Sequence, residues 1–326
     1  MQLAVQIERF PLRQVFRIAR GAKTEAPVVV AELTQNGVRG RGECGPNARY
    51  GETVESVAAT IESVRGAVEA GLDRTGLQAL LKPGAARNAL DCAFWDLEAK
   101  QAGKPAWQLA GLATPKPVHT VLTISLDDPD KMEAAARAAA DLPLLKLKLA
   151  GDGNDVPRVA AVRRGAPQAR LIADANEGYR REFLIADAPQ LAALGIEMLE
   201  QPLPAAEDEF LRDFDSPLPL GADESAHALD SLPALIGKYS VVNIKLDKTG
   251  GLTEALALAK AAREAGFEIM VGCMLGSSLG MAPGVLVAQM AKYVDLDAPL
   301  LLAKDRVPAL AYTGVQIAPP DPALWG

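Results

Sequence analysis

Five residues that could bind a metal ion or carry a proton recur along this chain at nearly equal steps. They are Lys148, Asp174, Glu200, Asp223 and Lys245, at successive intervals of 26, 26, 23 and 22 residues. Each interval is about the length of one strand, one helix and their loops. If consecutive strands close into a barrel, their ends bring such groups to one face, where barrel active sites are built. The spacing therefore predicts a site at the mouth of a β/α barrel.

The three acidic residues of this series each directly follow an apolar run. Carboxylates from successive strand ends, brought within a few ångströms, cannot all stay ionised without a cation. A site with few oxygen ligands suits Mg²⁺, with Mn²⁺ as the alternative ion. A single acid at a strand end commonly caps the following helix. Three acids in register favour a metal site formed by Asp174, Glu200 and Asp223.

The lysines of the series are placed to act as acid and base. Lys146 and Lys148 end one predicted strand, and strand alternation puts both side chains on the same face. Repulsion between them and partial desolvation should lower a lysine pKa, which makes a usable general base. Lys245 ends a strand four further along, so in a barrel it lies across the mouth from Lys148. Two bases on opposite sides of a metal suit proton removal α to a carboxylate on one face and proton return on the other.

Three further motifs have weaker signals. Asp295 and Asp297 place two negative charges on one face and could hold an ammonium group, although Asp-rich turns are common. The stretch Gly272–Ser278 could bind an anion through backbone NH groups at a helix start, or form a tight strand-to-helix turn. Lys248–Gly251 is predicted to be a turn, and neither of these last two motifs is assigned a catalytic role.

The elements that must position these groups begin after Pro117, where short apolar runs alternate with Ala-rich amphipathic segments. Helices predicted at Pro129–Ala140, Asn154–Arg164 and Leu252–Ala265 are long enough to connect parallel strands. An α/β fold with an eightfold barrel is the simplest closure. A doubly wound open sheet competes, but it places its chemistry at one switch point rather than once per unit. The eight predicted strands are Val118–Ile124, Leu144–Leu149, Leu171–Ala173, Ile196–Leu199, Leu218–Leu220, Val241–Ile244, Phe267–Val271 and Tyr293-Val294.

Residues 1–112 have a different pattern and are predicted to form an α+β domain. Two β-rich runs, Val28–Leu33 and Val38–Glu43, flank Asn36-Gly37, a dipeptide that favours a tight hairpin. Helices are expected at about Thr53–Ala70 and Ala85–Gln101. The barrel then occupies residues 113–302, and the tail 303–326 is expected to pack back on the first domain.

Composition restricts the class of partner. The net charge of −7 argues against a broad nucleic-acid-binding surface and favours a small-molecule partner. No apolar run approaches the ~20 residues needed to span a bilayer, and the first residues lack a secretory pattern. We therefore expect a soluble, cytoplasmic protein without a membrane partner. Three scattered cysteines and two histidines indicate neither a disulfide framework nor a zinc cluster.

Together these residues resemble the enolase superfamily, in its muconate-lactonizing-enzyme-like subgroup, over essentially the whole chain. The resemblance implies a barrel whose N-terminal α+β domain caps the mouth and selects the substrate. It also implies that the metal is Mg²⁺ and that Lys148 and Lys245 are the acid/base catalysts. The matching residues are Lys146 and Lys148 in Lys-x-Lys, Asp174 in Asp-Ala-Asn, Glu200 in Glu-Gln-Pro, Asp223 in Asp-Glu-Ser, and Lys245.

Within that subgroup the chain is most similar to the dipeptide epimerases, particularly those acting on L-Ala-D/L-Glu. The resemblance implies that Asp295 and Asp297 bind the dipeptide's α-ammonium group and that Thr123 contacts the substrate. It assigns the glutamyl side chain to a basic residue of an early loop, Arg20 or alternatively Lys23.

The resemblance also implies a wider setting. Lys146 would help to stabilise an enediolate, while Lys148 and Lys245 exchange the α-proton on opposite faces. The substrate would be a murein-derived dipeptide from cell-wall peptide recycling. Similar enzymes are often symmetric oligomers, so a homo-oligomer is an alternative to a monomer.

Two other functions remain open. Cycloisomerisation of the muconate type, or β-elimination of the o-succinylbenzoate synthase type, would use the same metal and lysines. Their substrates carry no ammonium group for Asp295 and Asp297. The remote alternative is a non-catalytic barrel that only binds a ligand.

Overall fold

Eight parallel strands follow one another in chain order in the computed structural model, which describes all 326 residues. The sheet curls until its two edges meet. At this closure the backbone N–H of Val121 donates to the carbonyl oxygen of Val294 at 2.8 Å. The predicted barrel is confirmed, and the doubly wound alternative is wrong. The strands are β5 (Leu122–Ile124), β6 (Leu144–Lys148), β7 (Arg170–Asp174), β8 (Ile196–Glu200), β9 (Leu220–Ala222), β10 (Val241–Lys245), β11 (Glu268–Gly272) and β12 (Tyr293–Val294).

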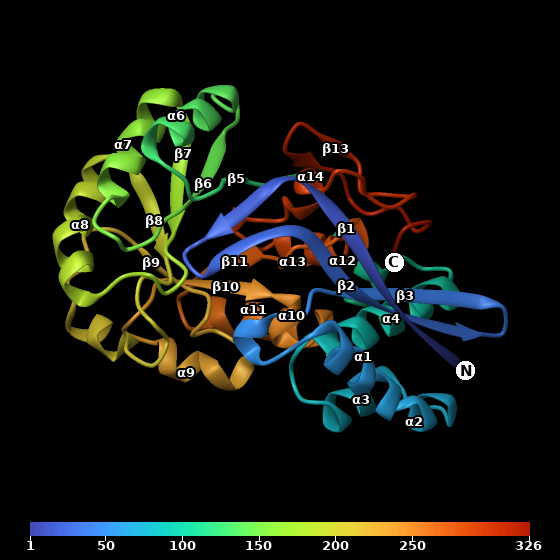
Figure 1. The fold of residues 1–326 in the computed structure, drawn as a ribbon. Coiled ribbons are helices and arrows are strands. Elements are labelled where there is room, and N and C mark those ends of the chain that lie inside the picture. The colour runs from blue at the N-terminus through green and yellow to red at the C-terminus, as the bar shows by residue number, and fades with distance from the viewer.

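Helices of unequal length connect these strands (Figure 1). The three predicted helices are confirmed as α6, α7 and α11, whereas α8 was not predicted and the β8–β9 connection contains only a 3₁₀ helix. None of the helices combines the length and apolar character needed to cross a membrane. The elements are α6 (Pro129–Ala138), α7 (Asp155–Gly165), α8 (Arg181–Ala193), η2 (Asp208–Asp213), η3 (Leu229–Ser231), α9 (Leu232–Leu235), α10 (Leu246–Thr249), α11 (Leu252–Glu264), α12 (Ser278–Met281), α13 (Gly284–Ala288) and α14 (Ala298–Leu301).

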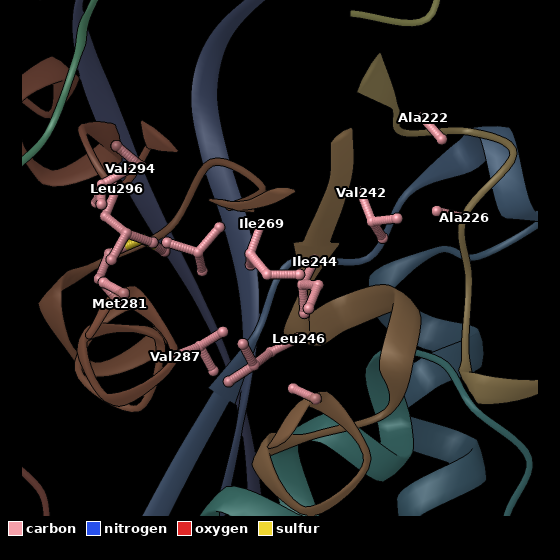
Figure 2. Close-up of a cluster of buried hydrophobic side chains, with 14 of the residues drawn as sticks. Ala222, Ala226, Val242, Ile244, Leu246, Ile269, Met281, Val287, Val294 and Leu296 are labelled. Carbon is pink, nitrogen blue, oxygen red and sulfur yellow. The ribbon is translucent and has the colours of Figure 1, made fainter. Parts of the chain in front are cut away.

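Strand alternation divides the barrel residues into an outer and an inner set. Outward side chains such as Ile244 and Ile269 join the large core beneath the helices, part of which Figure 2 shows. Inward side chains form a separate apolar layer near the strand starts, which includes Leu144 and Ile172. Two residues further along these strands, the inward positions are Lys146 and Asp174. The barrel interior therefore changes from apolar to charged toward the carboxyl ends of its strands.

The N-terminal domain is a three-stranded antiparallel sheet covered by helices. Asn36 and Gly37 both have positive φ, 52° and 80°, as a two-residue hairpin turn requires, so the predicted hairpin is confirmed. Helix α4 packs so closely on β3 that a Cβ at Gly42 would lie 2.1 Å from the carbonyl oxygen of Ala89. The elements are β1 (Gln2–Ile18), β2 (Gly21–Gln35), β3 (Val38–Cys44), η1 (Ala48–Tyr50), α1 (Val54–Ser63), α2 (Arg65–Glu69), α3 (Arg74–Leu80), α4 (Ala85–Ala102) and α5 (Ala106–Leu109).

Strand β1 and helix α3 were not predicted, and the single helix expected at Thr53–Ala70 is two helices. Pro11 interrupts the pattern of β1, and the register with β2 shifts between Pro11 and Phe16. Such a shift breaks the regular alternation on which strand prediction depends. In Figure 1 the long β1–β2 hairpin, in dark blue, extends from the N-terminal domain toward the barrel strands.

The predicted first barrel strand, Val118–Ile124, is wrong in its extent. Its first part is β4 (Val118–His119), which pairs with β14 (Gln316–Ile317) in a small sheet completed by β13 (Tyr312–Thr313). Only β5 belongs to the barrel. The backbone N–H of Thr120 donates to Val315 outside the barrel, so the chain changes sheets at this point.

The C-terminal segment contacts the N-terminal domain. Trp325 is fully buried, and its Nε1 donates to the carbonyl oxygen of Cys92 in α4 at 2.9 Å. The backbone N–H of Gly326 donates to Asp96 in the same helix at 2.7 Å. These bonds fasten the end of the chain to the helix that supports β3.

Candidate active site

The three acidic residues of the series converge inside the barrel mouth. Asp174 and Glu200 end β7 and β8, where they are register partners, and Asp223 directly follows β9. One carboxylate oxygen from each lies within 4.8 Å of the other two. All three side chains are buried. The parallel register of the strands is therefore what brings together residues that are distant in sequence.

This carboxylate cluster fits a hard divalent cation. Burial, and then the charge of Asp174, raises the pKa of Glu200 to about 7, so the cluster carries more negative charge than it can easily accommodate. The buried Oε2 of Glu200 accepts no hydrogen bond, although Lys146 Nζ lies 2.6 Å from it as an ion-pair partner. Oxygen-only donors and an unsatisfied carboxylate oxygen suit Mg²⁺ better than a soft metal.

Lys148 and Lys245 flank this cluster from strands β6 and β10. Lys148 Nζ donates to Asp174 Oδ2 at 2.6 Å, and Lys245 Nζ donates to Asp223 Oδ2 at 2.6 Å. Four strand positions separate β6 from β10 in the eight-stranded barrel, so the two ammonium groups approach from opposite sides. This is the arrangement that the spacing predicted.

Lys146 lies deeper than the other two lysines and contacts three carboxylates. Its Nζ is 2.6 Å from Glu200, 2.6 Å from Asp295 and 3.1 Å from Asp174. It is only 1% exposed, so its charge is balanced inside the protein rather than by water.

The lowering of the pKa predicted for the pair Lys146 and Lys148 is wrong for Lys146 in this geometry. Burial lowers the pKa of Lys146, but Asp295, Glu200 and Asp174 outweigh it and hold the pKa well above its ordinary value. Burial is likewise outweighed at Lys245, chiefly by Asp223, so that pKa is also raised. Each ammonium group faces carboxylates more closely than it faces another lysine.

A cavity of about 470 Å³ lies over the lysines, between the barrel and the N-terminal domain. Lys148 and Lys245 reach it, while Lys146 and the three metal-site acids lie beneath its lining. The cavity therefore gives a small molecule access to both proposed bases. Its lining includes Phe16, Ile18, Arg20, Lys23, Arg49, Thr123, Lys148, Lys245, Cys273, Met274, Asp295, Asp297 and Leu301.

The acidic pair forms one side of this cavity. Asp297 accepts a hydrogen bond from the backbone N–H of Thr123 at 2.8 Å, and Asp295 accepts one from Lys146 at 2.6 Å. Burial, and then the charge of Asp295, raises the pKa of Asp297 to about 7. A ligand cation placed beside the pair would relieve this repulsion.

The basic residues predicted on the early loop lie on the opposite wall. Arg20 occupies the tip between β1 and β2, where Nη2 lies 2.6 Å from Glu224 and Nη1 donates to the carbonyl oxygen of Asn176 at 2.7 Å. Lys23 lines the same cavity and is an exposed residue. The structure thus places both candidate cations where a ligand side chain could reach them.

Two residues without a predicted role orient two acids of the carboxylate cluster. Lys248, one turn beyond Lys245, donates to Asp223 Oδ1 at 2.6 Å, and Asn243 Nδ2 donates to Glu200 Oε1 at 2.5 Å. Asn243 lies two residues before Lys245 on β10, so the alternation that pairs Lys146 with Lys148 could have identified it. The contact of Lys248 had no comparable signal, because it depends on the tight turn of α10.

The glycine-rich stretch Gly272–Ser278 binds internal carboxylates instead of an external anion. The backbone N–H of Ser277 donates to Glu43 at 2.6 Å, and its hydroxyl also donates to Glu43. The backbone N–H of Ser278 donates to Asp305 at 3.1 Å. This turn therefore links the barrel to the N-terminal domain and to the C-terminal segment.

Comparisons with known proteins agree with this architecture. Residues 1–111 match the mandelate racemase / muconate lactonizing enzyme N-terminal domain, and residues 131–312 match the enolase C-terminal domain-like family. The chain is 49% identical over 309 residues to the L-Ala-D/L-Glu epimerase of Escherichia coli (strain K12), covering 94% of this chain and 96% of that protein. It is 43% identical over 302 residues to an N-acetyl-D-glutamate racemase of Pseudoalteromonas sp., covering 92% and 95%.

Solved structures give the same result. An enolase family member from Agrobacterium tumefaciens with homology to dipeptide epimerases, with bound sodium, L-Ala-L-Glu and an ordered loop, superposes with a TM-score of 0.97 at 50% identity. The match covers 99% of both chains. The chain therefore belongs to the mandelate racemase / muconate lactonizing enzyme family of the enolase superfamily.

Proposed function

We propose that this protein is a dipeptide epimerase that inverts the α-carbon of the C-terminal residue of L-Ala-D/L-Glu. The observation that carries the proposal is the placement of Lys148 and Lys245 on opposite sides of one buried carboxylate cluster, both lining one cavity. A base on each face suits inversion, whereas an elimination needs a base on only one face. The 49% identity to the Escherichia coli L-Ala-D/L-Glu epimerase supports this reaction.

Asp174, Glu200 and Asp223 would hold Mg²⁺, with Mn²⁺ as the alternative ion. When bound, such an ion neutralises negative charge on the cluster and on a substrate carboxylate, which makes the neighbouring Cα–H more acidic. Lys248 and Asn243 would keep the acids in place through the hydrogen bonds that they donate.

The proton transfer would use the two lysines in complementary states. One lysine, as the free amine, removes the α-proton, and the electron pair of the broken C–H bond moves into the carboxylate. For Lys245 this requires that a bound cation offset the charge of Asp223, which otherwise raises its pKa. The other lysine, as the ammonium ion, gives a proton to the opposite face of the same carbon. Each positioned group of this kind typically contributes about 10²- to 10⁴-fold to the rate. Lys146 stays charged between Glu200 and Asp295 and would stabilise the negative charge that develops.

Substrate recognition would be divided between the two walls of the cavity. Asp295 and Asp297 would bind the dipeptide's α-ammonium group, next to a contact from Thr123. Arg20 would bind the glutamyl carboxylate from the other wall. In this scheme residues 1–112 act as a capping domain over a catalytic barrel of residues 113–302.

A second candidate function is racemisation of an N-acylated glutamate. The 43% identity to the Pseudoalteromonas N-acetyl-D-glutamate racemase favours it, and it needs the same metal site and lysines. The two candidates differ in one group, because an N-acyl amino acid has no α-ammonium. Cycloisomerase and o-succinylbenzoate synthase substrates also lack it.

Proton exchange in D₂O separates these candidates. L-Ala-L-Glu and N-acetyl-L-glutamate are incubated separately with enzyme and Mg²⁺, and the α-proton signals are followed by NMR. We expect loss of the α-proton and growth of the second epimer with the dipeptide. Exchange confined to N-acetylglutamate would favour the second candidate, and exchange with neither would overturn the proposed chemistry. Asp297→Asn should slow exchange of the dipeptide more than exchange of the N-acetyl compound.

A further inference from the structure

Unusual backbone geometry is concentrated at one part of the barrel mouth. Four residues other than glycine have positive φ, namely Asn36, Asn176, Glu177 and Gln201. Asn36 belongs to the hairpin turn of the N-terminal sheet, but the other three immediately follow β7 and β8, beside the carboxylate cluster. Such conformations are costly for residues with a Cβ and persist where the surrounding structure determines them. The strained segment after β7 therefore needs an explanation in terms of what its side chains hold.

Glu177 is the residue of that segment with the most connections. Its carboxylate forms a bidentate pair with Arg49, at 2.6 Å from Nε and 2.8 Å from Nη2. It lies 3.2 Å from Arg20 Nη1 and accepts a hydrogen bond from the backbone N–H of Ala205 at 2.9 Å. The side chain is only 9% exposed. Bidentate arginine pairs fix geometry as well as charge.

The two arginines come from separate segments of the N-terminal domain. Arg20 lies at the tip of the β1–β2 hairpin and Arg49 lies in η1, yet both line the cavity. Glu177 is the one barrel side chain that contacts both guanidinium groups. The remaining bonds of Arg20 go to Glu224 and to the carbonyl oxygen of Asn176, so its guanidinium is held on several sides.

We propose that Glu177 is a positioning residue that docks both segments onto the barrel and orients Arg20 toward the side-chain carboxylate of the substrate. This inference rests on the proposed dipeptide epimerase function and deepens it. Glu177 acts through Arg20 and takes no part in the proton transfer.

The substitution Glu177→Gln tests this role without a large change in volume. A neutral amide cannot accept the bidentate bond from Arg49 and also neutralise Arg20, so the hairpin tip should be held less firmly, by Glu224 and the carbonyl oxygen of Asn176 alone. The loss should be selective for a substrate with an acidic side chain. L-Ala-L-Gln has nearly the same shape as L-Ala-L-Glu but lacks the side-chain charge. Its turnover therefore does not depend on an ion pair with Arg20.

We expect Glu177→Gln to lower the ratio of kcat/KM for L-Ala-L-Glu to that for L-Ala-L-Gln by about 10- to 100-fold, chiefly through KM. The matched control is Glu197→Gln. Glu197 forms the same kind of bidentate pair, with Arg170 at 2.9 and 2.7 Å, near the starts of β7 and β8. That variant should leave the ratio unchanged. A fall in kcat alone, equal for both substrates, would contradict the inference.

A double substitution tests whether Glu177 acts through Arg20. In an Arg20→Met background, Glu177→Gln should cause no further change in the Glu-to-Gln ratio, because the residue being positioned is absent. An additional loss of the same size as in the wild-type background would show that Glu177 acts independently, and would overturn the assigned role.

Trypsin cleavage after Arg20 provides a readout that does not depend on activity. Docking should protect the hairpin tip, so Glu177→Gln should be cleaved there about 10-fold faster than wild type, with Glu197→Gln unchanged. Unchanged cleavage together with an unchanged substrate ratio would overturn the inference. If Glu177→Gln is cleaved faster but the wild-type protein exchanges no α-proton of the dipeptide, docking by Glu177 would be supported and the proposed function would be overturned.

Discussion

The barrel mouth and the loops of the N-terminal domain build opposite walls of one cavity in different ways. The lysines and metal-site acids lie on or directly after strands, are buried, and are held by short bonds to one another. Arg20 and Arg49 lie on a hairpin tip and a 3₁₀ helix, with side chains 32% and 38% exposed. Strands fix a geometry, whereas loops can change without disturbing the barrel. Under the proposed function, the barrel would carry out the proton transfer and bind the α-ammonium group, and the loops would select the side chain of the substrate.

The largest effect is expected from the proposed metal site of the barrel, because the proton transfer depends on it. Glu200→Gln should lower kcat by about 10³-fold or more and weaken Mg²⁺ binding. Mg²⁺ at about 100 times its dissociation constant should stabilise wild type by about 2.7 kcal/mol. This stabilisation, measured by thermal denaturation with and without EDTA, should be much smaller in the variant. Glu197→Gln, on the same strand but outside the site, should behave as wild type.

A smaller and more selective effect is expected from the loop wall. Arg20→Met should lower kcat/KM for L-Ala-L-Glu by about 10- to 100-fold while kcat changes little, because a lost contact to the substrate side chain acts mainly on binding. L-Ala-L-Gln should be turned over almost as before. If kcat fell for both dipeptides, the division between the two walls would be wrong.

The difference between the walls also explains what the sequence could predict. Lys146, Lys148 and Lys245 follow from strand alternation and from the regular length of a β/α unit, both of which are local properties. The pairing of Arg20 and Arg49 with Glu177 joins three segments far apart in sequence, and no local pattern records it. The pKa shift predicted for Lys146 had the wrong sign for a similar reason. Its value depends on how closely the carboxylates approach, which only the folded structure shows.

For the fold too, local patterns were predictable and contacts between distant segments were not. Parallel strands and long amphipathic helices have clear periodicity, so the barrel and α6, α7 and α11 were recognised. The division of Val118–Ile124 between two sheets was missed. The first two residues pair with the distant segment Gln316–Ile317, whereas Leu122–Ile124 pair with β6 of the barrel. Continuous apolar patterning cannot show where a chain leaves one sheet for another.

A modest effect, on stability instead of activity, is expected where the two regions meet. Asp247 is half-buried and accepts hydrogen bonds from Gly45 and Asn88 of the N-terminal domain, both at 2.9 Å. Burial raises its pKa to about 7. The folded protein thus keeps a proton that an unfolded aspartate loses near pH ~3.9. The protonated Asp247 therefore contributes to the free energy of unfolding in acid, and this contribution is lost as the pH rises to about 7.

Asp247→Asn removes that titration. The free energy of unfolding, measured with urea across this pH range, should fall less steeply in the variant, by roughly 1 kcal/mol per pH unit. Asp213→Asn, at an exposed position, should keep the wild-type slope. Identical slopes for wild type and Asp247→Asn would show that the interface carboxyl ionises normally.

The central claim is that two opposing lysines exchange the α-proton, and solvent deuterium incorporation in single-lysine variants tests it most directly. Lys148→Ala and Lys245→Ala are incubated with Mg²⁺ in D₂O, each with L-Ala-L-Glu and with L-Ala-D-Glu, and Lys260→Ala serves as an exposed control. Wild type and the control should deuterate both epimers and interconvert them. Each active-site variant should lose interconversion by about 10³-fold or more, since the proton can no longer cross from one face to the other. Interconversion at close to the wild-type rate in both variants would contradict the two-base assignment.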